Sequence, residues 1–223
     1  MNKESERRKS ARRRVRRLVA ACMCLAAGAC SSLLPQPEAQ PGLYSLDYMP
    51  TGGGPPAAAG PGSAIVIVMV PRAAPGFDRA RMAYLREPHH LEYFAQNQWV
   101  DTPPRMLAPL LTTALERSGK FRSVLQAPST AAGQVRLATE ILRLQQEFFG
   151  SPSRVRFTLR ARLIDNASRQ VIATREFEAL VNAPSEDPYG GVQAANRAVN
   201  QVLGELAAFC AEQASNRPPP ANG

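Results

Sequence analysis

The sequence predicts an α+β fold in which a mostly antiparallel sheet carries two amphipathic helices packed on one face. The first observation is that residues 135–141, 155–163 and 171–181 alternate apolar with polar side chains, as strands with one buried face do. The second is that residues 103–118 and 188–214 repeat apolar side chains at helical spacing. Together these patterns predict helices that cover one face of a sheet.

The N-terminal residues 1–29 have the composition of a secretory signal peptide. A cluster of Lys and Arg precedes an uncharged apolar run at 18–29, and Cys30 follows at once. The run is shorter than the roughly 20 residues that a permanent membrane helix needs. Ala27 to Cys30 resembles a bacterial lipobox, although Ala27 stands where Leu is usual. The resemblance implies acylation of Cys30 and cleavage before it; the alternative is an ordinary signal with a chance cysteine.

The overall charge of +9 belongs mainly to this N-terminal segment. Residues 1–29 hold nine Lys and Arg against two Glu, so cleavage would leave 18 basic and 16 acidic residues. A mature charge near +2 removes the main support for nucleic-acid binding, which needs a basic patch on the folded domain. Ser31 and Ser32, with no Asp after Cys30, suggest an outer-membrane lipoprotein that faces the periplasm.

The chain after Cys30 reads as one domain between two polar ends. Residues 30–42 are rich in Pro and predict a tether, and residues 43–215 are long enough for a single domain with its own core. Within that domain, residues 43–49 suit a first strand, whereas the Gly- and Pro-rich residues 51–63 predict a loop. Residues 216–223 are expected to be a disordered tail.

The first half of the domain contains one buried strand and one helix. Residues 64–70 form a short apolar run rich in β-branched side chains, which indicates a strand covered on both faces. In the helix at 103–118, Thr102 is a candidate N-cap, and Pro103 stands in the first turn, where its missing N–H costs nothing. Gly119 is expected to end this helix.

The second half predicts a long antiparallel hairpin closed by a turn at 165–169. Its polar face carries a stripe of arginines: Arg154, Arg156, Arg160 and Arg162. One interpretation is a basic surface for acidic lipid headgroups or an acidic partner. The other is a solvated sheet face on which Glu176 and Glu178 of the return strand lie across from the arginines.

No constellation typical of catalysis stands out, so we expect neither an enzyme nor a cofactor. His89 and His90 are adjacent, and neighbours on a strand point to opposite faces, so both cannot ligate one metal from one strand. No Gly-x-Ser-x-Gly elbow of a hydrolase is present. Cys210 falls on the apolar face of the last helix and is expected to be a small core side chain.

The segment from Tyr84 to Leu107 resembles the ABC-type transport auxiliary lipoproteins, the family that includes the paraquat-inducible operon lipoprotein. The shared elements are a Tyr-Leu pair, a Pro, a Tyr, a Trp and a Pro-rich entry into an amphipathic helix. With the neighbouring His, the candidate partner-binding residues are Tyr84, Leu85, Pro88, His89, Tyr93, Trp99, Pro103 and Met106. Core packing is the alternative role for Trp99.

The resemblance implies a non-catalytic, lipid-anchored auxiliary component of an ABC/MCE-type (mammalian-cell-entry) system that moves lipids between the inner and outer membranes. It implies an MCE-domain protein and ABC transporter components as partners, and a homo-oligomer is possible. An alternative is an outer-membrane biogenesis lipoprotein that supports β-barrel assembly or lipopolysaccharide export. A lipid-anchored hydrolase is a third hypothesis.

Overall fold

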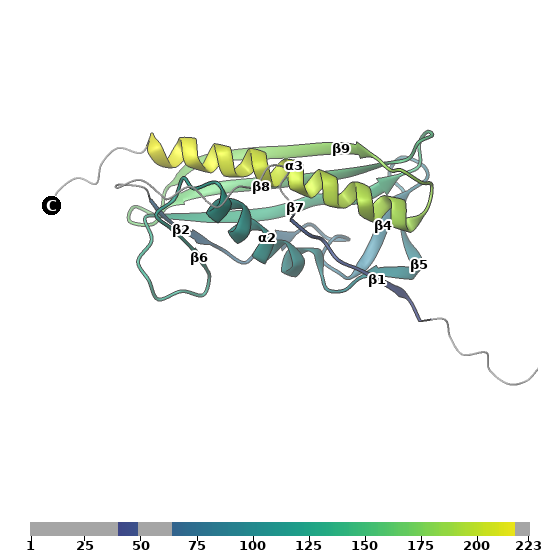
Figure 1. The fold of residues 1–223 in the computed structure, drawn as a ribbon, viewed down its shortest axis with the longest axis horizontal. Helices are drawn as coiled ribbons and strands as arrows, with labels where there is room; N and C mark the ends of the chain where they lie inside the picture. The colour runs from purple at the N-terminus through teal and green to yellow at the C-terminus, as the bar shows by residue number, and fades with distance from the viewer. Residues whose placement is uncertain (1–39, 49–63, 217–223) are drawn as a thin grey trace, which may run out of the picture. The chain divides into compact units, whose positions relative to one another are not determined.

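The computed structural model describes residues 40–48 and 64–216, and Figure 1 shows their arrangement. Cys30, the signal peptide, most of the expected tether, the loop at 51–63 and nearly all of the tail lie outside the described residues. From Pro41 onward the described residues belong to one compact unit. Its hydrophobic core runs from Leu46 to Cys210, so this unit carries a complete core and can fold on its own.

Three long antiparallel strands form the larger part of the sheet. They are β7 (Val135–Glu147), β8 (Arg154–Asp165) and β9 (Val171–Asn182). β8 pairs with β7 on one side and with β9 on the other, along nearly its whole length. The hairpin expected from the sequence is therefore confirmed, and β7 continues six residues beyond the expected end at Ile141.

Shorter strands complete a mixed sheet of nine strands within the part of the chain that is described. The second edge of β7 pairs in turn with three parallel strands, β2 (Ile65–Val68), β3 (Arg72–Ala73) and β4 (Arg81–Leu85). Beyond these lie β5 (Leu91–Trp99), antiparallel to β4, and two further parallel strands, β1 (Gly42–Tyr44) beside β5 and β6 (Ser123–Gln126) beside β2. The parallel pairings are short, so antiparallel pairing dominates as expected.

Two helices, α2 (Pro103–Arg117) and α3 (Pro188–Ser215), lie close to their expected bounds. Thr102 is the N-cap residue of α2, but the expected side-chain cap is wrong: its hydroxyl makes no capping bond. Instead, the Asp101 carboxylate accepts a hydrogen bond from the Thr102 N–H at 2.7 Å. At α3, the Asp187 carboxylate accepts from the Gly190 N–H at 2.7 Å, and this bond lowers the pKa of Asp187.

Both helices contribute to one core on the same face of the sheet, and the long α3 lies along β8 and β9 (Figure 1). The inward side chains of β8, from Val155 to Leu163, are buried there, as the alternation predicted. Cys210 is fully buried in this core, and burial raises the pKa of its thiol to about 12. The expectation that Cys210 is a core side chain is confirmed.

Candidate functional site

The eight candidate partner-binding residues divide into buried and accessible groups. Pro88 and His89 are exposed in the turn between β4 and β5, and Tyr93 is half-buried. The buried members are Tyr84, Leu85, Trp99, Pro103 and Met106. The accessible part of this segment is therefore the β4–β5 turn, where His89 has a left-handed backbone with φ of 68°.

The aromatic side chains of β4 and β5 hold this region together. The Tyr84 hydroxyl donates to the Glu92 carboxylate at 2.9 Å, and this bond raises the pKa of Tyr84. The Tyr84 ring lies 4.5 Å from that of Phe94, and the Tyr93 hydroxyl donates to the Gly76 carbonyl at 3.1 Å. These contacts give both tyrosines a structural role.

Trp99 ends β5 and is only 4% exposed. Its backbone N–H donates to the Ala80 carbonyl at 2.7 Å, and it pairs in register with Tyr44 of β1. The geometry favours the core-packing alternative for this side chain. Contact between the indole and a partner stays a prediction that requires the ring to become accessible.

The first two arginines of the predicted basic stripe bind a carboxylate that is nearly buried. Glu147 of β7, whose side chain is 3% exposed, accepts from the Arg154 Nε at 3.3 Å and from the Arg156 Nε at 2.6 Å. Burial by itself would raise the pKa of Glu147, but hydrogen bonds from Arg156 and from Gln145 hold it below its ordinary value. Arg156 also bridges to Glu178 of β9.

The third arginine of the stripe, Arg160, lies between two carboxylates on either side of β8. Its Nη1 is 3.3 Å from Glu140 of β7, and its Nη2 is 2.7 Å from Glu176 of β9. At Arg154, Arg156 and Arg160 the structure thus favours the second interpretation, a solvated sheet face with cross-strand ion pairs. The contribution of β7 was not predicted, because the expected strand ended at Ile141, short of Glu147, and its pairing with β8 was not part of the expected hairpin.

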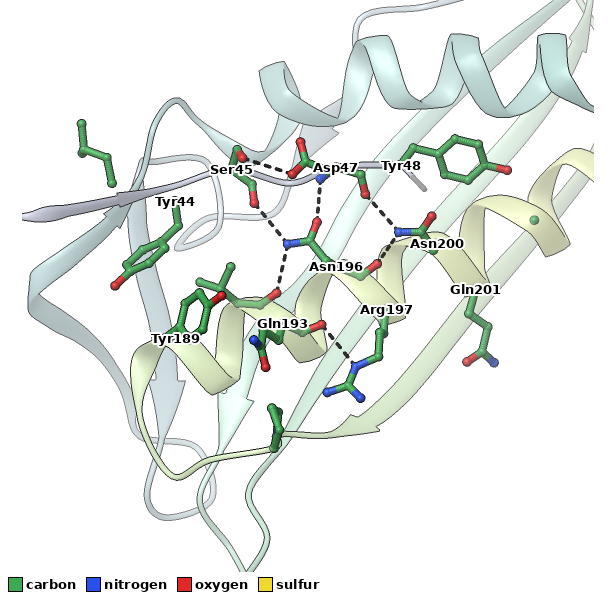
Figure 2. Close-up of a pocket in the computed structure, with 14 residues that line it drawn as sticks. Tyr44, Ser45, Asp47, Tyr48, Tyr189, Gln193, Asn196, Arg197, Asn200 and Gln201 are labelled. Carbon is green, nitrogen blue, oxygen red and sulfur yellow. Dashed lines mark hydrogen bonds between the residues drawn. The ribbon is translucent and has the colours of Figure 1, made fainter. Parts of the chain in front are cut away.

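A groove of about 1080 Å³ lies between the segment at 43–48 and α3 (Figure 2). We call residues 43–48 the anchor segment, because they directly follow the expected tether. The rings of Tyr44 and Tyr189 face one another across the groove with centroids 6.2 Å apart. Leu43 and Tyr189 are more than half exposed, so the groove offers accessible apolar surface.

Two asparagines one helical turn apart fasten the anchor segment to α3, as Figure 2 shows. The Asn196 side chain accepts from the Asp47 N–H at 2.6 Å and donates to the Ser45 carbonyl at 3.2 Å. The Asn200 side chain donates to the Asp47 carbonyl at 3.0 Å. These bonds satisfy backbone groups of an extended segment as a neighbouring strand would.

This asparagine clamp, formed by Asn196 and Asn200, was not predicted from the sequence. The available signal was two amide side chains at i, i+4 spacing in a helix that is otherwise rich in apolar and small residues. The partner is a segment roughly 150 residues earlier in the chain. Only the tertiary structure brings the two together.

Two further properties of the site follow from the described ranges 40–48 and 64–216. Within them, no group of three or more His, Cys, Asp or Glu side chains is placed to hold a metal ion. Neither of the helices described there is long and apolar enough to cross a membrane.

Several solved structures share this fold. Protein XCC0632 from Xanthomonas campestris superposes with a TM-score of 0.66 at 21% identity, covering 78% of this chain and 96% of its own. An uncharacterized protein matches with a TM-score of 0.58 at 13% identity, covering 78% and 98% of the two chains. At these identities the likeness concerns the fold alone.

No curated protein matches the chain. A family model described as "ABC-type transport auxiliary lipoprotein component" does match, over residues 44–207. This range extends from β1 into α3. It includes the anchor segment from Tyr44 onward, the asparagine clamp, and the sheet face that carries Arg154, Arg156 and Arg160. The chain therefore belongs to the family of ABC-type transport auxiliary lipoprotein components.

Proposed function

We propose that the protein is a non-catalytic auxiliary component of an ABC/MCE-type system that transports lipids between the inner and outer membranes. The observation that carries this proposal is the family match over residues 44–207. Membership makes the chain an auxiliary lipoprotein component of ABC-type transport. The lipid cargo, the MCE-domain partner and the position at the outer membrane, facing the periplasm, are the proposed refinements.

The anchor segment supports a role in which a membrane attachment is passed on to the folded domain. If Cys30 carries the lipid, the expected tether at 30–42 leads directly into β1 and the anchor segment. There the asparagine clamp joins the chain to α3, which packs along the core face of β8 and β9. Force between the membrane and a partner would thus reach the core through the pairing of β1 with β5 and through α3.

The β4–β5 turn and the groove beside α3 are the proposed contact surfaces for a protein partner. Pro88 and His89 are accessible at the turn, and Tyr189 offers an exposed aromatic ring at the groove. Aromatic side chains are enriched at protein interfaces because they supply large and stiff contact areas. The buried candidates of the same segment, Trp99 among them, would then hold these surfaces in place. Assembly of several copies around a ring-shaped partner is part of the proposal.

The test is photo-cross-linking in native membranes, with a photoreactive residue at His89 in one variant and at Tyr189 in another. Lys120, which is exposed after α2, is the matched control position. Recovery of an MCE-domain protein and ABC components from His89 or Tyr189, but not from Lys120, is expected. A Cys30→Ala form should lose these products because it lacks the anchor.

Recovery of only an outer-membrane β-barrel would contradict the proposal and support the alternative role in barrel assembly or lipopolysaccharide export. Equal recovery from all three positions would contradict the proposed contact surfaces. Light scattering on residues 41–223 tests the homo-oligomer separately, and a strictly monomeric result at high concentration would exclude self-assembly by the domain alone.

A further inference from the structure

A second hollow, of about 920 Å³, lies beside the connection from β2 to β3, near the start of β7 and the β8–β9 turn. Leu137 and Leu163 of the neighbouring strands face the core. Because alternate residues of a strand point to opposite faces, Arg136 and Arg162 project from the other face of the sheet, away from α3. The hollow is therefore separate from the groove at the anchor segment.

Four exposed arginines from different elements line this hollow. They are Arg72 of β3, Arg136 of β7, Arg162 of β8 and Arg169 of the β8–β9 turn. Arg162 is the member of the predicted stripe that the cross-strand ion pairs leave out. Among the described residues, none of these four guanidinium groups forms a salt bridge or a side-chain hydrogen bond, so each is available to an anion.

The carboxylates in the hollow do not offset this charge. Glu140 is 3.3 Å from Arg160, a fifth arginine at the edge of the hollow that also binds Glu176. The Asp165 carboxylate accepts hydrogen bonds from the backbone N–H groups of Ala167 and Ser168 in its own turn. Five guanidinium groups thus face two carboxylates. The rest of the charged sheet face, in contrast, pairs its arginines with glutamates.

Apolar side chains border the same hollow. Met69, Val70, Pro71 and Ile164 line it, and Val70 is 59% exposed. An exposed valine beside unpaired guanidinium groups suits a ligand that joins an anionic group to an apolar one. An acidic peptide would satisfy the arginines but would gain less from this border.

We propose that this hollow, the arginine hollow, binds the phosphate headgroup of an anionic phospholipid. Guanidinium groups form paired, charge-assisted hydrogen bonds with phosphate oxygens. Arg136 and Arg162 lie on the adjacent strands β7 and β8, while Arg72 and Arg169 reach the hollow from β3 and from the β8–β9 turn. The border at Val70 contacts the glycerol and the first part of the acyl chains.

The inference adds a ligand to the proposed transport role and rests on that role only for the source of the lipid. A binding assay with purified domain and vesicles contains no transport partner. Failure of binding would therefore overturn the arginine hollow and leave the transport role standing. Failure of the cross-linking test would overturn the transport role and leave the arginine hollow standing.

The experiment is vesicle sedimentation with residues 41–223, using phosphatidylglycerol vesicles and, as the uncharged comparison, phosphatidylcholine vesicles. The variant is Arg136→Gln/Arg162→Gln, and the matched control is Arg86→Gln/Arg117→Gln, which removes the same charge at two exposed arginines outside the hollow. Each basic side chain at an anionic surface contributes about a fivefold factor in affinity. The hollow variant is therefore expected to bind about 25-fold more weakly.

Three results would overturn the proposal. The first is equal loss in the hollow variant and in the matched control, which would indicate general charge attraction. The second is equal binding to phosphatidylcholine vesicles. The third is tighter binding of a tetraglutamate peptide than of short-chain phosphatidylglycerol in solution, which would identify an acidic protein partner. Support requires phosphatidylglycerol binding that drops about 25-fold in the hollow variant alone and weakens as salt rises.

Discussion

Replacing Glu147 by Gln tests whether the charged sheet face depends on a buried carboxylate. The Glu147 side chain is 3% exposed and accepts from Arg154, Arg156 and Gln145. A glutamine keeps the shape, but it replaces one acceptor oxygen by an NH2 group that would face the guanidinium donors. Breaking a buried pair costs about 3–5 kcal/mol, but the two guanidinium groups stay 22% and 40% exposed. We therefore expect a loss of about 2 kcal/mol in the free energy of unfolding.

Urea denaturation of residues 41–223, followed by circular dichroism, measures this loss. Glu176→Gln is the matched control: its side chain is 52% exposed, so its ion pair is screened by water and a much smaller change is expected. A Glu147→Gln variant within about 1 kcal/mol of wild type would refute the reasoning, because exposed ion pairs contribute up to about 1 kcal/mol.

The pH dependence of Glu147 provides a second readout of the same prediction. The pKa of this carboxyl is lowered in the fold from its ordinary value of 4.5. Its ionised form therefore stabilises the protein above pH 4.5, and this stabilisation is lost as pH falls through the lower folded pKa. The difference between wild type and Glu147→Gln should be full near pH 7 and should shrink below pH 4.5.

Three further predictions concern α3 and its contacts. Asn196→Ala/Asn200→Ala should speed amide exchange and proteolysis in the anchor segment by at least about tenfold, since each lost hydrogen bond contributes roughly 1 kcal/mol. Unchanged exchange in that segment would contradict the clamp. Cys210 should resist Ellman's reagent in the native protein and react fully in urea, because only the thiolate attacks and burial raises its pKa to about 12. Asp187→Ala should lower the stability of the domain by about 1 kcal/mol through loss of the cap at Gly190, which thermal unfolding measures; a wild-type Tm would contradict this.

Local patterns were sufficient where a structural feature depends on neighbouring residues. The alternation at 155–163 specified which side chains of β8 are buried, because a strand places successive side chains on opposite faces. The apolar spacing at 188–214 located α3 to within a residue at its end. Glu176 and Glu178 could be placed opposite the arginines because a hairpin fixes the register of its two strands.

The sequence left open every feature that depends on strand order. Three separate parallel strands share one edge of β7, and no alternation pattern states which strands will be neighbours. The candidate site shows the same limit. Glu147 reaches Arg156 through the β7–β8 register, which no sequence pattern specified. The sequence is compatible with a core or a partner role for Trp99, and only its burial favours the core.

By itself the sequence determined the α+β class, the helices and the long hairpin, because periodicity and turn residues act over a few positions. Its resemblance to the auxiliary lipoproteins indicated the family that the match over 44–207 establishes. The tertiary structure alone decided which arginines are paired and which are free, and where the anchor segment docks on α3. Those features depend on strand register and on contacts between separate elements, up to about 150 residues apart for the anchor segment, which form only when the sheet and helices have packed together.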